Sequence, residues 1–381
     1  MTEPRVALSH DYLNQYGGAE RVVEVFHRVY PDAPVYTSIF DPDSMPPDYA
    51  TWDVRTSFLQ HVPGVHRNHQ PYLPLYPLAF KFLRVDEGYD VLLSSSSAWG
   101  KGIRVPPDML HICYCHSPMR FAWDFDHYAE RERMDWVSRR AVQPILRRLR
   151  NWDRATAKRV HHFIANSRTV QKRIAEYWGR TSTVIHPPVD TESFRTARQD
   201  QVEEYFVLVS RLVPYKRFDL AIEAANELAF PLKIIGDGRA RAELEEMAGP
   251  TVEFLGRVSD DERNRLFARC RAAIFPAEDD FGIGQVEVQA AGRPVIAFDR
   301  GGAQETVIDG ETGVLFSPQT TDGLIDAIRR FEALTFSTES IAWHAQQFSR
   351  DRFEREIREF VSERFAAFSG LRSGTVDQAG D

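Results

Sequence analysis

Residues 272–298 read AAIFPAEDDFGIGQVEVQAAGRPVIAF and contain the clearest indication of the fold. This stretch opens with a short apolar run (272–276), passes through three acids and two glycines, continues as a helix-like segment and closes with a second apolar run (294–298). Strand, helix and strand at this spacing predict a parallel α/β unit with both sheet faces covered. Ligands of such sheets bind beyond the carboxyl ends of the strands, which draws attention to the acids and glycines.

The same alternation extends in both directions along the chain. In the first half, strands are expected at residues 5–10, 34–40, 89–95, 110–115 and 161–165. In the second half, strands are expected at residues 183–186, 205–210, 232–236, 252–255, 272–276 and 294–298. The pattern predicts two doubly wound α/β domains of similar size.

The alternation relaxes around residues 178–199, where IHPPVDTESF brings two prolines and several turn formers. We therefore expect domains at 1–180 and 181–348. The long helical segment 349–368 is expected to pack back on the first domain, and residues 369–381 to form a flexible tail.

Composition narrows the class of protein. The chain has 381 residues, 43% of them hydrophobic, and a net charge of −8, which argues against nucleic acid as a partner. Its three cysteines are too few for a disulfide framework. The sequence enters an expected strand at residue 5 without a signal peptide, and no apolar run approaches the ~18 residues of a membrane span. These features predict a cytoplasmic protein.

The strand ends of the second half carry cations, glycines and carboxylates. In chain order they are Arg211 and Lys216, Gly236–Gly238, Gly256 and Arg257, Glu278–Gly284, and Arg300–Gly302. Arg211 and Lys216 in one short loop suit a diphosphate, because a guanidinium forks onto phosphate oxygens and an ammonium adds a point charge. Pairing of both cations with local acids is the alternative. Gly236-Asp237-Gly238 is weaker evidence, since it also fits a generic turn.

Gly282-Ile283-Gly284 precedes an expected helix near Gln285. Backbone N–H groups at a helix start favour anions, and glycines permit close approach. Glu287, about one turn into the helix, is suited to sugar hydroxyls, although a role in stabilising the helix dipole is also open.

The first half also has glycines before an expected helix, and a histidine at the end of an expected strand. Gly17 and Gly18 stand between a strand and a helix, and His116 ends a strand. Alternation along that strand turns Cys113 and Cys115 away from His116, so we expect no metal site of these residues. A structural role for His116 remains the alternative.

The segment Arg139–Arg159 contains a single acid, Asp153. It predicts either a solvated helix face or a basic face that meets an anionic membrane surface or a phosphate-bearing acceptor.

Taken together, the motifs resemble the retaining glycosyltransferases of family 4, whose GT-B fold has two facing Rossmann-like domains with an inter-domain cleft. The resemblance covers nearly the whole chain and rests on the order and spacing of GGAERV, CHSP, SRLVPYKRFDLAIEA, IIGDG, FLGRV and GRPVIAFDRGGAQETV. The early motifs look most like bacterial polysaccharide and O-antigen mannosyltransferases that use GDP-mannose. The resemblance makes 1–180 the acceptor-side domain and 181–348 the donor domain.

The resemblance also assigns roles. The catalytic residues it implies are His116, Arg211, Lys216, Asp279 and Glu287. The donor-binding residues it implies are Gly17, Gly18, Gly236, Asp237, Arg257, Val258, Phe281, Gly282, Ile283 and Gly284. Arg211 and Lys216 would hold the diphosphate, Glu287 the ribose, Asp279 the transferred sugar, and Arg257 with Val258 the base. His116 would contact the sugar near the reacting carbon. No metal and no cofactor are expected, because the cations supply the charge.

One departure from the family concerns the acidic pair. The family usually has two glutamates with seven residues between them, whereas this chain has Asp279 and Glu287. Glu278 could take the role of Asp279 if the loop shifts by one residue. Because Asp279 is shorter than a glutamate, it could change which sugar the site holds.

The expected function is transfer of a hexose, with mannose from GDP-mannose as the first choice, to a saccharide or lipid-linked saccharide in cell-surface polysaccharide synthesis, at the inner face of the membrane if the basic face binds there. The enzyme alternatives are a UDP-sugar-dependent transferase and a nucleotide-sugar epimerase. A glycosidase would not need the cations, and a metal-dependent transferase would use Glu278–Asp280. The non-enzyme alternative is a protein that only binds sugar nucleotides.

Overall fold

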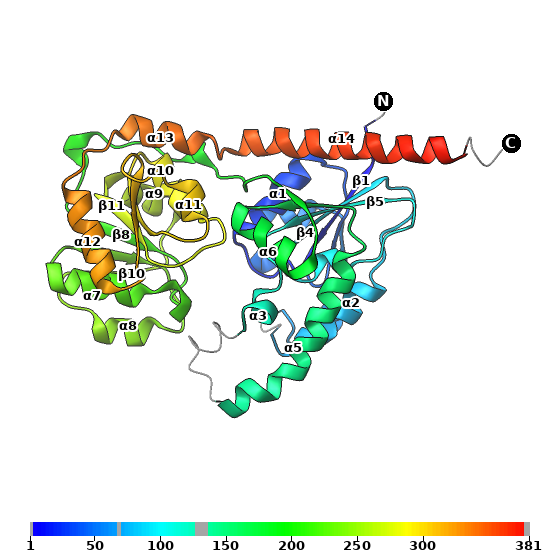
Figure 1. Cartoon of the computed structure of the whole chain (residues 1–381), viewed down its shortest axis with the longest axis horizontal. Helices are drawn as coiled ribbons and strands as arrows, with labels where there is room; N and C mark the ends of the chain where they lie inside the picture. Colours follow the sequence, from blue (N-terminus) through cyan, green and yellow to red (C-terminus); the bar gives the residue numbers. More distant parts are fainter. Residues whose placement is uncertain (1–2, 67–69, 126–135, 377–381) are drawn as a thin grey trace. The chain divides into compact units, whose positions relative to one another are not determined.

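The computed structural model describes residues 3–66, 70–125 and 136–376. Two compact units share these residues (Figure 1). The N-terminal unit holds the described residues up to Pro188 and those from Asp351 onward, and the C-terminal unit spans Val189–Arg350. The division after Pro188 falls in the proline-rich segment, whereas the sequence places the boundary after residue 180.

The N-terminal unit is built on a parallel sheet of seven strands in the order β3-β2-β1-β4-β5-β6-β7. Its strands are β1 (Val6–His10), β2 (Val35–Thr37), β3 (Val54–Thr56), β4 (Val91–Ser96), β5 (Leu110–Cys115), β6 (His162–Ala165) and β7 (Ser182–Val184). The sequence assigns the strand at 183–186 to the second domain. That assignment is wrong, because the strand pairs with β6 as the edge of this first sheet.

Helices cover both faces of this sheet (Figure 1). They are α1 (Gly18–Val29), α2 (Tyr76–Phe82), α3 (Arg120–Trp123), α5 (Trp136–Ala157), α6 (Arg168–Trp178) and α14 (Arg350–Val376). On one face α14 runs alongside α1, and Phe353 stacks on Phe26 with ring centroids 5.9 Å apart (Figure 1). On the other face Cys113 and Cys115 pack with Phe163 and Ile174. Consecutive side chains of β5 therefore point to opposite faces of the pleated sheet, and each packs in the apolar layer on its own face.

The last helix is longer than the sequence indicates. Residues 369–376, expected to belong to a flexible tail, continue α14 as far as Val376. This segment contains no proline, so nothing in it breaks the i to i−4 hydrogen-bond ladder. The rest of the expected tail lies outside the described residues.

The C-terminal unit has a parallel sheet of six strands in the order β10-β9-β8-β11-β12-β13. Its strands are β8 (Phe206–Val209), β9 (Leu232–Ile235), β10 (Val252–Gly256), β11 (Ala272–Phe275), β12 (Val295–Phe298) and β13 (Gly313–Phe316). Its helices are α7 (Phe218–Leu228), α8 (Arg241–Met247), α9 (Asp260–Arg269), α10 (Ile283–Ala290), α11 (Ala303–Thr306), α12 (Thr321–Glu332) and α13 (Thr338–Gln346).

Two apolar layers sandwich this second sheet as well. Phe206 and Leu208 pack with residues of α7 and α12, whereas Val207 packs with residues of α9 and α10. Because both faces of β8 are buried, the strand reads as a continuous apolar run. Both units are therefore Rossmann-like α/β domains, and the predicted fold class is confirmed.

No helix among residues 3–66, 70–125 and 136–376 is both long enough and apolar enough to cross a bilayer.

Candidate active site

The predicted residues of the C-terminal unit lie along one edge of its sheet. Arg211 follows β8, Asp237 follows β9, Arg257 follows β10 and Asp279 follows β11. These strands are parallel neighbours, so their carboxyl ends share an edge. The structure thus gathers at one rim side chains that are up to 68 positions apart in the sequence.

Lys216 and Asp279 form an ion pair at this rim. Lys216 ends the short 3-10 helix Pro214–Lys216, and its ammonium Nζ contacts Oδ1 of Asp279. The two side chains are 17% and 19% exposed. A cation proposed for a phosphate and a carboxylate proposed for a sugar therefore meet in one partly buried place, where ion pairs are less screened than on an open surface.

Two glycines fix the loop that carries Arg211. Gly236 has a φ of +131°, and a Cβ there would lie 1.9 Å from the carbonyl oxygen of Ser210. A Cβ on Gly238 would lie 2.3 Å from the carbonyl oxygen of Leu212. The Gly-Asp-Gly turn is therefore required for packing against the Arg211 loop. Arg211 itself is exposed, with its guanidinium 3.3 Å from the hydroxyl of Tyr215.

A second glycine turn supports the acidic loop. A Cβ on Gly301 would lie 2.2 Å from the carbonyl oxygen of Asp279, and one on Gly302 would lie 2.0 Å from that of Phe281. The amide of Gly302 donates to the carbonyl of Asp279 at 2.8 Å. Substitution at either glycine would push the loop away, so these residues set the position of the Asp279 backbone.

The helix expected near Gln285 begins at Ile283, and Gly282 precedes it with a φ of +89° and no side-chain cap. Gly284 lies against Phe275, since a Cβ there would be 3.2 Å from its ring. Glu287 is the fifth helical residue and is 8% exposed. The helix start and Glu287 thus lie where the sequence predicts, next along the chain from Asp279.

The base-side residues follow β10. The amide of Gly236 donates to the carbonyl of Gly256 at 2.7 Å, so the two turns adjoin. Arg257 is exposed, and Val258 is partly buried against the apolar layer of α9 and α10. Asp237 is exposed and accepts from the amide of Gly238 at 2.8 Å. Asp237 thus shapes its own turn.

Sequence reasoning missed a buried polar cluster beneath α10. Gln285 accepts at 2.7 Å from the hydroxyl of Thr306, and Gln289 donates at 2.8 Å to the carbonyl of Thr306. His344 also contacts that carbonyl, at 3.1 Å. The signal was the presence of two glutamines four residues apart in α10, on either side of Glu287.

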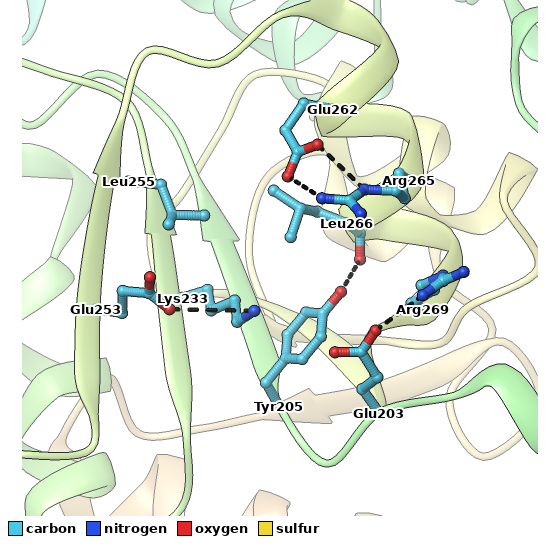
Figure 2. Close-up of a pocket in the computed structure, with 9 residues that line it drawn as sticks. All are labelled: Glu203, Tyr205, Lys233, Glu253, Leu255, Glu262, Arg265, Leu266 and Arg269. Carbon is cyan, nitrogen blue, oxygen red and sulfur yellow. Dashed lines mark hydrogen bonds and ion pairs between the residues drawn. The ribbon is translucent and has the colours of Figure 1, made fainter.

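Figure 2 shows a hollow of about 210 Å³ elsewhere in the C-terminal unit. Its charged residues pair with each other: Glu262 with Arg265 at 2.7 Å, Glu203 with Arg269 at 3.2 Å, and Lys233 with Glu253 at 4.0 Å (Figure 2). Three acids thus balance three cations, which leaves no surplus positive charge for a diphosphate. Residues 203 and 205 precede β8, so the hollow extends toward the opposite edge of the sheet from Arg211.

In the N-terminal unit the structure links His116 to the glycine turn. His116 follows β5, and its Nε2 lies 2.7 Å from Oγ of Ser95. Ser95 Oγ lies 3.1 Å from Nδ1 of His10, whose Nε2 lies 3.4 Å from a carboxylate oxygen of Glu20. Glu20 belongs to the first turn of α1, which begins at Gly18. His10, Ser95 and Glu20 were not predicted, although His10 and Ser95 lie at strand ends.

Asp11 was also missed. Its buried carboxylate accepts from the amides of Ser97, Ala98, Trp99 and Gly100 at 2.8, 2.9, 2.8 and 2.5 Å. Four donors satisfy the charge that burial would otherwise penalise. Asp11 therefore ties the end of β1 to the loop after β4, and its signal was a charged residue at the end of an apolar run.

Among the described residues, no three His, Cys, Asp or Glu side chains are grouped as metal ligands would be.

Two family models match successive parts of the chain. Residues 16–193 match Glycosyltransferase Family 4, and residues 203–333 match Glycosyl transferases group 1. The chain belongs to this family of glycosyltransferases, and its two Rossmann-like units are those of the GT-B fold. Recognition of the family from its motifs is thereby confirmed.

Among solved structures, the chain is similar to Anabaena HepE in complex with UDP. The TM-score is 0.70 at 20% identity, with 94% of this chain and 100% of that chain covered. This likeness supports the fold.

Curated relatives match over shorter regions. O-antigen chain mannosyltransferase C of Escherichia coli is 26% identical over 209 residues, which are 51% of this chain and 54% of the relative. A GDP-mannose-dependent phosphatidylinositol monomannoside mannosyltransferase of Mycolicibacterium smegmatis is 31% identical over 192 residues, 42% of this chain and 50% of the relative. The chain spans about half the length of these curated relatives.

Proposed function

We propose that this chain transfers a hexosyl group, mannose from GDP-mannose, to a saccharide or lipid-linked saccharide with retention of anomeric configuration. One observation carries the proposal: parallel strands bring Arg211, Lys216 and Asp279 to one rim, where a diphosphate would take the place of Asp279 at the Lys216 ammonium. Cations for a diphosphate and an acceptor for sugar hydroxyls are the two things a nucleotide sugar needs. Membership of the glycosyltransferase family supports transfer, and the two mannosyltransferase relatives support the choice of mannose.

The chemistry that these residues can assist is departure of a nucleoside diphosphate. The acceptor oxygen bonds to the anomeric carbon as the bond from that carbon to the phosphate oxygen breaks, and the acceptor proton passes to the leaving phosphate. Negative charge grows on the diphosphate, where Arg211, Lys216 and the uncapped start of α10 would stabilise it. Charge stabilisation of this kind needs no nucleophilic side chain.

The remaining roles are assigned by the same proposal. Asp279 would hold the hexose and Glu287 the ribose, while Arg257 and Val258 would lie against the base. In the N-terminal unit, His116 would contact the transferred sugar and the backbone of Gly18 would approach the diphosphate.

A peripheral contact with an anionic membrane is part of the proposal, and α5 supports it. Asp153, the single acid of Arg139–Arg159, is fully buried and pairs with Lys101 at 2.5 Å. It therefore adds no negative charge to the exposed side of the helix. Arg147 and Arg148 are exposed on this helix, and Ile145, which is 46% exposed, lies one turn from Arg148. Cations beside an exposed apolar residue suit a lipid surface.

Donor binding tests the proposal first. GDP-mannose, UDP-glucose and GDP would be titrated into the protein by calorimetry, and GDP release would then be followed with methyl α-mannoside as acceptor. GDP-mannose should bind in preference to UDP-glucose and yield GDP only when acceptor is present. Preference for UDP-glucose would favour the UDP-sugar transferase, and conversion of the sugar nucleotide alone would favour the epimerase. Binding without turnover would favour a binding protein.

A further inference from the structure

A chain of hydrogen-bonded side chains crosses the N-terminal unit from α1 to the end of β5. It runs from Glu20 to His10, from His10 to Ser95 and from Ser95 to His116, with separations of 3.4, 3.1 and 2.7 Å. Glu20, His10 and Ser95 are buried. A buried polar chain is kept only when its members satisfy one another, so the protons along it are strongly constrained.

The neighbours of His10 show where its protons lie. Nδ1 is 3.2 Å from the carbonyl oxygen of Ser95, which can only accept, so Nδ1 carries a proton. Nε2 lies 3.4 Å from a carboxylate oxygen of Glu20, the second partner of the ring. Burial lowers the pKa of His10, but the hydrogen bond and charge of Glu20, together with the charge of Asp11, raise it by more.

The proton on His10 sets the direction of the next hydrogen bond. Ser95 Oγ accepts from Nδ1 of His10, so its own hydrogen is directed to Nε2 of His116. If His116 instead donated from Nε2, the hydroxyl hydrogen of Ser95 would have no acceptor among its described side-chain contacts. Nε2 of His116 therefore accepts, and the proton of the neutral ring sits on Nδ1.

We propose that Ser95, His10 and Glu20 are positioning residues that hold His116 in its Nδ1–H tautomer. In that state the second ring nitrogen can donate to an oxygen of a bound sugar and cannot accept from it. The tautomer stands on the hydrogen bonds alone, whereas its consequence for sugar transfer rests on the proposed function.

These hydrogen-bonded side chains also connect two features that the sequence analysis treated separately, the glycine turn and His116. A Cβ on Gly17 would lie 3.3 Å from Oε2 of Glu20, so the glycine turn adjoins the carboxylate that begins the chain. The turn and His116 are thus the two ends of one network, which a purely structural role for either would not require.

The test is a nitrogen NMR measurement on the intact, nucleotide-free protein labelled with ¹⁵N-histidine. Wild-type His116 should show the shift pattern of an Nδ1–H, Nε2-acceptor ring, and Ser95→Ala should convert it to a mixture of tautomers. Ser94→Ala is the matched control, because Ser94 is buried on the same strand but bonds to His111 at 2.9 Å. This control should leave the His116 signals unchanged.

Two substitutions of His10 keep the test decisive if Ser95→Ala fails to fold. His10→Asn keeps an amide nitrogen on Cγ, where Nδ1 was, and should preserve the His116 tautomer. His10→Gln places its amide farther out, toward Glu20, and should lose it. Equal effects of the two, an unchanged His116 in Ser95→Ala, or an Nε2–H ring in the wild type would each overturn the proposal.

Turnover then tests the consequence. Ser95→Ala should lower kcat about 10- to 100-fold with little change in the KM for the donor, as expected when a contacting group is misplaced. Ser94→Ala should retain both constants. The tautomer is measured without substrate. The NMR result therefore tests the tautomer of His116 even if the protein proves to transfer no sugar.

Discussion

At the scale of single residues, the Lys216–Asp279 pair carries most of the functional argument. The sequence predicts both residues as ligands of a sugar nucleotide, and the structure adds that each is already the other's partner. A bound diphosphate would compete with Asp279 for the ammonium. A ligand that binds either side chain would therefore have to displace or share this ion pair.

We predict that Lys216→Ala lowers turnover roughly 30- to 1,000-fold, since loss of a preorganised charge at the leaving group costs about 2–4 kcal/mol of transition-state stabilisation. Initial rates of GDP release measure this effect. Lys233→Ala is the control, because Lys233 is a cation of the same unit in the charge-balanced hollow (Figure 2). Similar losses in the two variants would remove Lys216 from the site.

Residue-level prediction from the sequence succeeds where a rule of topology applies and fails where side chains pair. Arg211, Asp237 and Asp279 could be brought to one rim because parallel strands end together. The contact of Lys216 with Asp279 could not be foreseen, nor could the four amides around Asp11, because both depend on loop conformations that span many positions. Ser95 stood in a run of four serines whose neighbours only the sheet register reveals.

At the scale of elements, glycine turns decide where the rim residues lie. Gly236 lies at the end of β9, where positive φ and a carbonyl 1.9 Å from any Cβ exclude other residues. Gly310, in the same unit, has a φ of +81° but nothing within 4 Å of its Cβ position. A side chain at Gly310 would therefore cause backbone strain alone, whereas a side chain at Gly236 would cause backbone strain and a steric clash.

We predict that Gly310→Ala costs about 1–2 kcal/mol of the free energy of unfolding, the usual penalty of a left-handed residue. Gly236→Ala should cost more and should also weaken donor binding, because it displaces the loop of Arg211. Chemical denaturation and calorimetry measure the two effects. Equal stability losses with unchanged donor affinity would contradict the role of this turn.

His111, in β5, makes the stability of the folded protein depend on pH. Burial, followed by the charges of His161, Arg159 and Lys101, lowers the pKa of His111 to about 3. Below about pH 6.5, His111 therefore binds a proton in the unfolded state but stays neutral in the folded state. This contribution to stability is complete above that pH and is lost as the pH falls toward 3.

We predict that the free energy of unfolding falls by about 2 kcal/mol between about pH 6.5 and pH 5 through His111 alone. Urea titrations of the wild type and His111→Gln at the two pH values isolate the effect. The variant should lose correspondingly less stability on acidification. An equal loss in both proteins would show that His111 titrates normally.

Most elements could be predicted from apolar periodicity, and the exceptions have physical causes. The edge strand β3 (Val54–Thr56) has one apolar residue and is only partly buried, so it shows no apolar run. The final strand β13 (Gly313–Phe316) begins with a glycine, a residue depleted in strands. The strand at 182–184 was placed in the wrong domain because chain order alone does not say which sheet an edge strand joins.

At the scale of the whole molecule, charge is unevenly distributed. The net charge is −8, yet the exposed side of α5 carries Arg147 and Arg148, and the one acid of Arg139–Arg159 is buried. Several other arginines of this stretch are tied down, such as Arg150 to the carbonyl of Ala122 at 2.6 Å. Arg147 and Arg148 are therefore the cations to test against lipid.

We predict that Arg147→Gln with Arg148→Gln weakens binding to phosphatidylserine vesicles about 30-fold, since each basic residue near an anionic surface contributes about 1 kcal/mol. Vesicle sedimentation measures the binding. Arg198→Gln with Arg329→Gln is the control of equal net charge, because both residues are exposed in the C-terminal unit. An equal loss in the control would indicate attraction by overall charge, and no loss would leave α5 as a solvated helix.

If the rim of Arg211, Lys216 and Asp279 binds a nucleotide sugar, GDP-mannose should stabilise the folded protein against heat, which thermal unfolding with and without this ligand measures. At about 100 times its dissociation constant, a ligand of the folded state adds roughly 2.7 kcal/mol. We predict a rise in Tm of about 5–10 °C for the wild type, retained in Lys233→Ala and lost in Lys216→Ala. No rise with GDP-mannose, UDP-glucose or GDP, or a full rise in Lys216→Ala, would contradict it.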